Sequence, residues 1–185
     1  MSLTIEIPDP SLVLLIGSSG AGKSTFSSSH FQPTEVVSSD HCRAMISDDE
    51  SDQTINAEAF GLLHQIARLR IQQRKLTVID ATNLQFRARR PLLRMARAHK
   101  LPIVAIVFQV SLETCLTHNQ ARSERQVSEE VLELHQQQFA ETLLRLDREG
   151  YGQIYVIEKP DFPNLVVQKL RWESPMVLTG NQSKG

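Results

Sequence analysis

The chain has 185 residues, of which 41% are hydrophobic and 22% charged, and its formal net charge is −1. This length suits one well-buried domain, and the small net charge gives no global electrostatic argument for nucleic-acid binding, which must then rest on local patches. The longest apolar runs have the length of strands, and the N-terminal MSLTIEIPDP has no signal-peptide pattern, so we expect no membrane association. The two cysteines, Cys42 and Cys115, form no CxxC pair or disulfide framework, which favours a cytoplasmic location.

Apolar runs and amphipathic segments alternate along the chain. Runs rich in β-branched residues predict five strands, at 11–17, 34–39, 76–81, 103–108 and 153–158. Helical patterns lie near 23–30, 54–74, 85–99, 111–120 and 129–148. This alternation predicts an α/β fold with a mostly parallel, doubly wound sheet of about five strands flanked by helices. We expect one domain over residues 1–170 and a linker-like or disordered tail over 171–185.

The stretch GSSGAGKST, residues 17–25, matches the pattern G-x-x-x-x-G-K-[ST] and follows a predicted strand. Its glycines permit positive φ angles and close backbone approach, so the loop amides can surround a phosphate at the start of the following helix. Lys23 would bridge the β- and γ-phosphates of ATP or another NTP, and the Ser24 hydroxyl would hold Mg²⁺. The predicted nucleotide-binding residues are Gly17, Ser18, Ser19, Gly20, Ala21, Gly22, Lys23, Ser24 and Thr25.

Asp40 and Arg43 follow the second predicted strand, at the sheet edge where ligands collect in a doubly wound fold. A carboxylate there could accept a proton from an acceptor hydroxyl as the hydroxyl attacks the γ-phosphorus. The arginine three residues on could bind an anionic group, such as a phosphate, on the same acceptor. The alternative is that Asp40 caps the helix HCRAMI, but beside a P-loop the catalytic interpretation gains weight.

Asp80 ends the third predicted strand, in VIDATN. Many P-loop proteins have an acidic residue at this position that binds Mg²⁺ directly or through water. Asp80 is therefore a candidate metal-associated residue, together with Ser24. Its competing role is a cap on the following helix.

Two groups of arginines complete the candidates. Arg122 and Arg125 lie in a polar break, HNQARSERQV, which could close over the nucleotide as a lid and stabilise the transferred phosphoryl group, although arginine pairs in loops are often only solvated surface. The helical segment QFRARRPLLRMARAHK has six cations and no acid, which suits either a nucleic-acid backbone or a solvated face. These cations are Arg87, Arg89, Arg90, Arg94, Arg97 and Lys100.

The stretches IGSSGAGKSTF, PTEVVSSDHCRAMISDDESDQ, KLTVIDATNLQ and RSERQV together resemble the kinase domain of bacterial polynucleotide kinase–phosphatase RNA-repair enzymes. They resemble the bacteriophage polynucleotide kinase more distantly. The resemblance covers roughly residues 1–170, and SSDxCR followed by SDDExDQ is much more specific than the P-loop. It implies transfer of the γ-phosphate of ATP or another NTP to the 5′-hydroxyl end of RNA or DNA.

By position, the resemblance implies that Asp40 is the general base and that Arg43 holds the phosphate next to the acceptor 5′-hydroxyl nucleoside. Arg122 and Arg125 would be lid arginines on the ATP phosphates. Gln53 matches a family glutamine near the active site and is a candidate substrate-binding residue.

The chain departs from this family in two respects. His118 stands where members usually have an arginine at the start of the lid, and a histidine is only partly charged at neutral pH, so a weaker phosphate clamp is expected. The full repair enzymes continue into a metallophosphatase and an adenylyltransferase, and nothing in this sequence resembles either. The chain is then a stand-alone kinase or a domain of a larger enzyme, and phosphatase or ligase repair proteins are expected as partners.

The leading hypothesis is an ATP- and Mg²⁺-dependent polynucleotide 5′-hydroxyl kinase, with Asp40 as base and Lys23, Arg122 and Arg125 neutralising charge. One rival is a P-loop kinase of a small metabolite or nucleotide-sugar, because Arg43 would suit any phosphorylated acceptor. Another rival is a nucleotide-binding regulatory module with little kinase activity. His118 in place of a lid arginine favours a regulatory module, whereas Asp40 disfavours it, because a protein that only binds nucleotide needs no acceptor base.

Overall fold

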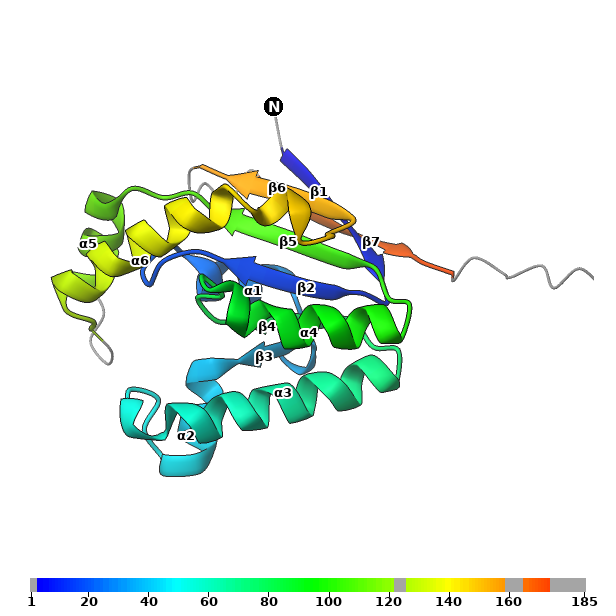
Figure 1. The fold of residues 1–185 in the computed structure, drawn as a ribbon, viewed down its shortest axis with the longest axis horizontal. Coiled ribbons are helices and arrows are strands. Elements are labelled where there is room, and N and C mark those ends of the chain that lie inside the picture. Colours follow the sequence, from blue (N-terminus) through cyan, green and yellow to red (C-terminus); the bar gives the residue numbers. More distant parts are fainter. Residues whose placement is uncertain (1–2, 122–125, 159–164, 174–185) are drawn as a thin grey trace, which may run out of the picture.

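The computed structural model describes residues 3–121, 126–158 and 165–173 (Figure 1). Five parallel strands form the central sheet in the order β3-β4-β2-β5-β6. Because this order differs from the chain order, the connections cross the sheet, as in a doubly wound fold. The predicted α/β class with a five-stranded parallel sheet is confirmed. The strands are β2 (Leu12–Ile16), β3 (Val36–Ser38), β4 (Thr77–Asp80), β5 (Ile103–Phe108) and β6 (Gln153–Ile157).

The five predicted helices form close to their predicted positions, and a further helix, α2 (Ser39–Ser47), forms after β3 (Figure 1). The last predicted helix is shorter than the predicted segment 129–148, because the chain leaves the α-helix after Leu143 and forms a separate 3₁₀ turn, η3 (Leu146–Arg148). Two further 3₁₀ turns are η1 (Pro33–Glu35) and η2 (Gln53–Ile55). The helices are α1 (Lys23–His30), α2 (Ser39–Ser47), α3 (Asn56–Gln72), α4 (Phe86–Ala98), α5 (Leu112–Gln120) and α6 (Glu129–Leu143).

The helix caps settle two alternatives left open by the sequence. The N-cap of α2 is Ser38, whose hydroxyl accepts a hydrogen bond from the His41 amide (3.3 Å), so Asp40 lies in the first turn and is not the cap. The N-cap of α4 is Gln85, so Asp80 is not a cap either. Both cap interpretations are wrong, and both carboxylates are free of that structural role.

The central strands are apolar throughout because cores form on both faces of the sheet. Every residue of β2 and of β5 is buried. In β2, Leu12 and Leu14 belong to the core that includes α3 and α4, whereas Val13 belongs to the core that includes α1 and α5. Cys42 and Cys115 are buried, one in each core, and they form no disulfide with each other.

A second sheet, of two parallel strands, was not predicted. It pairs β1 (Leu3–Asp9) with β7 (Leu165–Arg171), and Ile7 of β1 is buried in the core on the α1 side. The Tyr155 hydroxyl on β6 donates a hydrogen bond to the Glu6 carbonyl (3.0 Å), which joins this pair to the central sheet. The pairing partners lie at opposite ends of the described chain, so no local pattern in the sequence indicates that they meet.

The described chain continues past β7 to residue 173. Trp172 donates its backbone N–H to the Asp9 carbonyl (2.9 Å), and its side chain packs against the core that includes α3 and α4. Residues 174–185 lie outside the described residues, so the expected tail stays a prediction. None of the helices in the described ranges is long and apolar enough to cross a membrane.

The basic helix α4 is only partly a surface feature. Arg89 is 1% exposed and forms a buried ion pair with Glu149; its Nε donates to Glu149 Oε2 (2.8 Å), and its Nη1 donates to the Asn83 carbonyl (2.6 Å). Arg97 donates to the backbone carbonyl of Glu149. These two arginines hold α4 to the segment after α6, and breaking such a buried pair costs about 3–5 kcal/mol. The exposed cations of this segment are Arg87, Arg90, Arg94, Arg97 and Lys100, and only Arg89 is buried.

Candidate nucleotide and acceptor site

The loop between β2 and α1 has the backbone conformation of a phosphate cradle. Gly20 and Gly22 have φ angles of 79° and 90°, in the left-handed region that glycine adopts without strain. A Cβ atom on Gly20 would lie 2.5 Å from the Cys115 carbonyl oxygen, so glycine is required for α5 to pack against the loop. Gly22 is the N-cap of α1 and provides no side-chain cap, which leaves the first amides of α1 available to an anion.

Lys23 is held at the centre of this loop. Its side chain is almost fully buried, and its ammonium group donates hydrogen bonds to the carbonyl oxygens of Gly17 (2.9 Å) and Ser18 (2.7 Å). The Gly17 amide donates to the Thr82 carbonyl (3.1 Å), which ties the loop to the segment after β4. The ammonium group is therefore positioned where it could exchange these carbonyl partners for phosphate oxygens.

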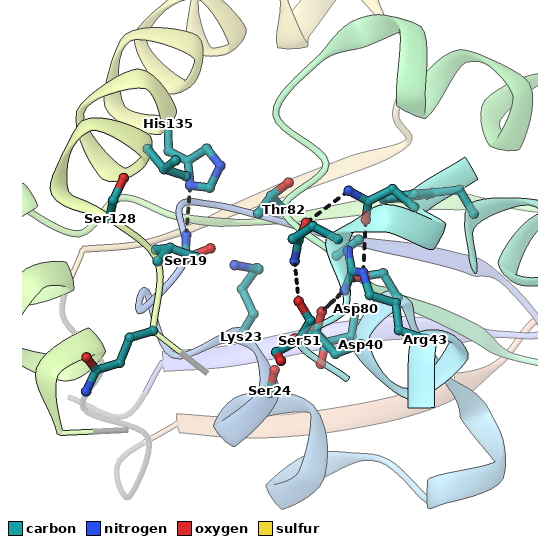
Figure 2. A pocket seen from close by; sticks show the side chains of 18 residues that line it. Ser19, Lys23, Ser24, Asp40, Arg43, Ser51, Asp80, Thr82, Ser128 and His135 are labelled. Carbon is teal, nitrogen blue, oxygen red and sulfur yellow. Dashed lines mark hydrogen bonds and ion pairs between the residues drawn. The ribbon is translucent and has the colours of Figure 1, made fainter. Parts of the chain in front are cut away.

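The predicted residues that line one cavity of 460 Å³ come from four segments: the P-loop and α1, α2, η2 and the end of β4 (Figure 2). In this view Ser19 lies on one side of Lys23, and Asp40 and Arg43 lie on the other. The rest of the P-loop builds the loop without lining the cavity. Arg122 and Arg125 lie outside the described residues, so their lid role stays a prediction. The predicted residues that line the cavity are Ser19, Lys23, Ser24, Asp40, Arg43, Gln53 and Asp80.

Asp80 is the buried carboxylate of the cavity, at 6% exposure. It accepts hydrogen bonds from the Ser27 hydroxyl (3.2 Å) and from Ser24. Burial raises the pKa of Asp80, the charge of Lys23 opposes this shift, and the charge of Asp40 adds to it. A serine hydroxyl beside a carboxylate fits Mg²⁺, which takes one or two protein oxygens and completes its shell with water and phosphate. The described residues contain no cluster of three or more His, Cys, Asp or Glu that would hold a metal unaided.

Asp40 and Arg43 form an ion pair on α2 that belongs to a longer chain of hydrogen bonds. Arg43 Nη1 donates to Asp40 Oδ1 (2.5 Å), and Arg43 Nε donates to Asn56 Oδ1 (2.9 Å). Asn56 in turn donates to Gln53 Oε1 (2.9 Å). The Arg43 side chain is 5% exposed and that of Asp40 is 30% exposed, so the arginine is fixed while the carboxylate remains accessible. Gln53, which lines the cavity, is thus linked to the ion pair through Asn56, a residue that the sequence did not single out. Its substrate-binding role stays a prediction.

Asn119, at the end of α5, closes the segment that carries the two proposed lid arginines. Its side-chain amide donates to the Val127 carbonyl (2.8 Å), and its carbonyl accepts from the Val127 amide (3.0 Å). The Gln126 side chain also donates to the Gln120 carbonyl (3.2 Å). Since Gln126, Val127 and Ser128 line the cavity, these bonds fix the described ends of the segment beside it.

Two histidines contact the P-loop backbone, and neither contact was predicted. His118 Nδ1 lies 2.8 Å from the Gly20 carbonyl oxygen, and His135 Nδ1 accepts a hydrogen bond from the Ser19 amide (3.5 Å). His135 also lines the cavity, on the side of Ser19 (Figure 2). A histidine within an amphipathic helix gives no sequence signal for such a contact. The expected effect of His118 on a phosphate clamp stays a prediction.

Replacement of Asn119 by alanine is expected to lower kcat/KM for phosphoryl transfer about tenfold. The variant loses both bonds to Val127 and leaves partly buried backbone groups without these partners, at a cost of about 1 kcal/mol, so the segment would no longer be fixed at the cavity. Steady-state kinetics with varied ATP measures this effect. Gln120→Ala is a suitable control, because Gln120 contributes only a backbone carbonyl to the segment among the described hydrogen bonds. Unchanged kinetics in Asn119→Ala would contradict the proposed lid.

The site geometry agrees with a comparison to known protein families. The AAA_33 family, described as an AAA domain, matches residues 12–142, which include the P-loop, the Asp40–Arg43 pair, Asp80 and Asn119. The chain belongs to this family. Its fold is that of the P-loop kinases. No curated protein matches the chain.

Solved structures share this fold at low sequence identity. The Pnkp1/Rnl/Hen1 RNA repair complex contains a chain with a TM-score of 0.63 and 24% identity, over 74% of this AAA_33 member and 46% of that chain. Kti12 from Chaetomium thermophilum, in complex with ADP-AlF₃, has a TM-score of 0.57 and 12% identity, over 81% of this AAA_33 member and 90% of the Kti12 chain. A chain in a structure of the PezAT toxin–antitoxin system of Streptococcus pneumoniae has a TM-score of 0.59 and 12% identity, over 82% of this AAA_33 member and 69% of that chain. This member therefore spans less than half of the first of these chains, and the three proteins are diverse.

Proposed function

We propose that this AAA_33 member transfers the γ-phosphate of ATP or another NTP to the 5′-hydroxyl end of RNA or DNA. The observation that carries this proposal is that Lys23 of the P-loop and the ion pair of Asp40 and Arg43 line the same cavity. A protein that only binds nucleotide has no need of the second group. The structural likeness to a chain of an RNA repair complex supports the nucleic-acid acceptor.

The donor side of the reaction rests on the P-loop. Its amides and Lys23 would bind the triphosphate and neutralise charge on the phosphoryl group as it moves. Ser24 and Asp80 would hold Mg²⁺, which would supply further charge neutralisation on the phosphates. The proposed lid, with Arg122 and Arg125, would cover the same group from the α5–α6 side.

The acceptor side rests on Asp40. One of its oxygens, Oδ1, is held by Arg43, and the carboxylate could take the proton of the attacking 5′-hydroxyl. A new bond then forms between the 5′-oxygen and the γ-phosphorus, the bond from phosphorus to the bridging oxygen breaks, and the nucleoside diphosphate leaves. Arg43 Nη2 makes no hydrogen bond to the described residues, so the same guanidinium could bind the phosphate beside the acceptor nucleoside.

A small phosphorylated metabolite is the second candidate acceptor. Arg43 would bind its phosphate as well as that of a nucleotide, and a cavity of 460 Å³ has the size of a small-molecule site. This alternative shares the donor chemistry and the proposed base, and it differs only in the molecule that carries the hydroxyl.

Transfer from γ-labelled ATP with Mg²⁺ distinguishes these acceptors. We expect label on a 5′-hydroxyl oligonucleotide and none on the same oligonucleotide with a 5′-phosphate. A panel of phosphorylated and unphosphorylated small alcohols is assayed in parallel under the same conditions. Label on small alcohols alone would mean that the acceptor is a metabolite and not a polynucleotide. Nucleotide binding without any transfer would favour the regulatory module.

A further inference from the structure

A groove of 760 Å³ lies between α3 and α4, which run side by side (Figure 1). Four arginines line it, Arg68 from α3 and Arg87, Arg90 and Arg94 from α4. The α4 arginines have the spacing i, i+3, i+7, so they lie along one face of the helix on successive turns. The groove is therefore lined by a row of positive charges along α4, with a further one from α3.

These charges have no acidic partners in the described part of the chain. The side chains that line the groove include no acid, and Arg68 and Arg87 hydrogen-bond to neutral glutamine side chains at 2.5–3.3 Å. Arg90 and Arg94 are exposed and make no ion pair with a described residue. His64 also lines the groove, and burial lowers its pKa, which favours the neutral imidazole. The positive charge of the groove at neutral pH therefore comes from the arginines.

The groove arginines differ in their contacts from two other arginines of α4, which hold this helix in place. Arg89 and Arg97 are bound to Glu149, and their charge serves the packing of α4. The groove arginines serve no such contact among the described residues. In a chain of net charge −1, four arginines in one groove are a pronounced local asymmetry, of the kind that binds an anionic polymer.

The groove also begins where the proposed active site ends. Asn56 and Phe60 of α3 line the cavity, and Gly61, the next residue, lines the groove. Thr82 lines the cavity shortly before α4 begins, and Arg87 in the first turns of α4 lines the groove. Both walls of the groove thus lead away from the cavity, along the two helices.

We propose that the groove binds the sugar–phosphate backbone of a single-stranded polynucleotide whose 5′ end occupies the cavity. This inference rests on the proposed function, because that function supplies the strand whose 5′ end enters the site. Each guanidinium would bind a phosphate and release counterions from the strand. No Phe, Tyr or Trp side chain among the described residues lines the groove, so we expect binding to rest on the phosphates and to be independent of base sequence.

The test uses the double variant Arg90→Gln/Arg94→Gln and a charge-matched control, Lys75→Gln/Arg148→Gln, which removes two exposed cations away from the groove. Binding of a fluorescent 5′-phosphorylated 12-mer is measured by anisotropy over a series of NaCl concentrations. We expect the groove variant to bind about tenfold more weakly. Its slope of log K against log salt should fall by about 1.4, because each phosphate contact on a single strand contributes about 0.7. Equal affinity and slope in the groove variant and the control would overturn the proposal.

Kinetics separate this proposal from the kinase function on which it rests. For a 5′-hydroxyl 12-mer, the groove variant should have a KM about tenfold higher than the protein without substitutions, with kcat unchanged. For a nucleoside 3′-monophosphate, too short to reach the groove, KM should not change. If the 12-mer and the mononucleotide respond alike, the groove proposal fails and the kinase function stands. If no acceptor is phosphorylated but the binding data follow the expectation, the kinase function fails and the groove binds nucleic acid without it.

An acidic protein segment is the competing occupant of a basic groove. A polyglutamate peptide matched in charge to the 12-mer is therefore added as competitor in the anisotropy assay. We expect it to displace the 12-mer only at far higher concentration, because glutamate carboxylates lie on flexible side chains that lose rotamer freedom on binding, whereas the phosphates belong to a regularly spaced backbone. Displacement at equal charge concentration would overturn the polynucleotide assignment in favour of a protein partner.

Discussion

Replacement of Asp40 by asparagine should lower kcat for transfer to a 5′-hydroxyl by about 10²–10⁴-fold, the contribution usual for a positioned general base. Asparagine retains an oxygen that can accept the hydrogen bond from Arg43, now 2.5 Å from Asp40 Oδ1, but it cannot take the proton of the attacking hydroxyl. Binding of ATP should be unchanged, because the donor phosphates are bound by the P-loop. Single-turnover transfer and equilibrium nucleotide binding measure the two quantities separately.

The matched control for this substitution is Asp48→Asn. Asp48 is an exposed aspartate at the other end of α2, in the left-handed conformation that asparagine also tolerates. We expect neither transfer nor nucleotide binding to change in this variant. Comparable turnover in Asp40→Asn and the control would remove Asp40 from the role of base. Loss of nucleotide binding in Asp40→Asn would show that its effect is on the donor side instead.

The sequence was informative wherever one segment carried its own signal. The buried strands β2 and β5 appear as continuous apolar runs because both of their faces are covered. The pair formed by β1 and β7 gave no such signal. Its stability comes from a partner more than 150 residues away, Leu3 beside Leu165 at one end of the register, and from packing against the central sheet.

The same distinction applies to the candidate site. Lys23 and Asp40 could be identified because each follows a strand within a recognisable motif. Asn56 and His135 could not, because they reach the cavity only through the folding of α3 and α6 over the sheet. The basic helix α4 shows most clearly what the sequence alone does not reveal. Its arginines look equivalent in sequence, but burial separates Arg89, which pairs with Glu149, from Arg90, which is exposed.

Replacement of Asp80 by asparagine should make the protein more stable at neutral pH and less active. The pKa of Asp80 is raised chiefly by burial, so the folded state favours its protonated form. The folded state then binds a proton that the unfolded state has released, and stability falls as pH rises through the raised pKa. Above that pKa the cost of the buried charge is fully present, and asparagine removes it. About 1 kcal/mol changes the Tm of a protein of this size by about 2–4 °C, which calorimetry resolves.

The pH dependence and the activity make this prediction specific. The stability advantage of Asp80→Asn should be largest above the raised pKa of Asp80 and should shrink as the pH falls below it, where the native carboxyl becomes protonated. Mg²⁺-dependent kcat/KM should fall about 100-fold or more, because asparagine is a neutral and weaker ligand beside Ser24. Asp147→Asn, at an exposed position, should change neither quantity. A variant less stable than the native protein at neutral pH would mean that attraction between Asp80 and Lys23 outweighs the cost of burial, and unchanged activity would exclude Asp80 from the metal site.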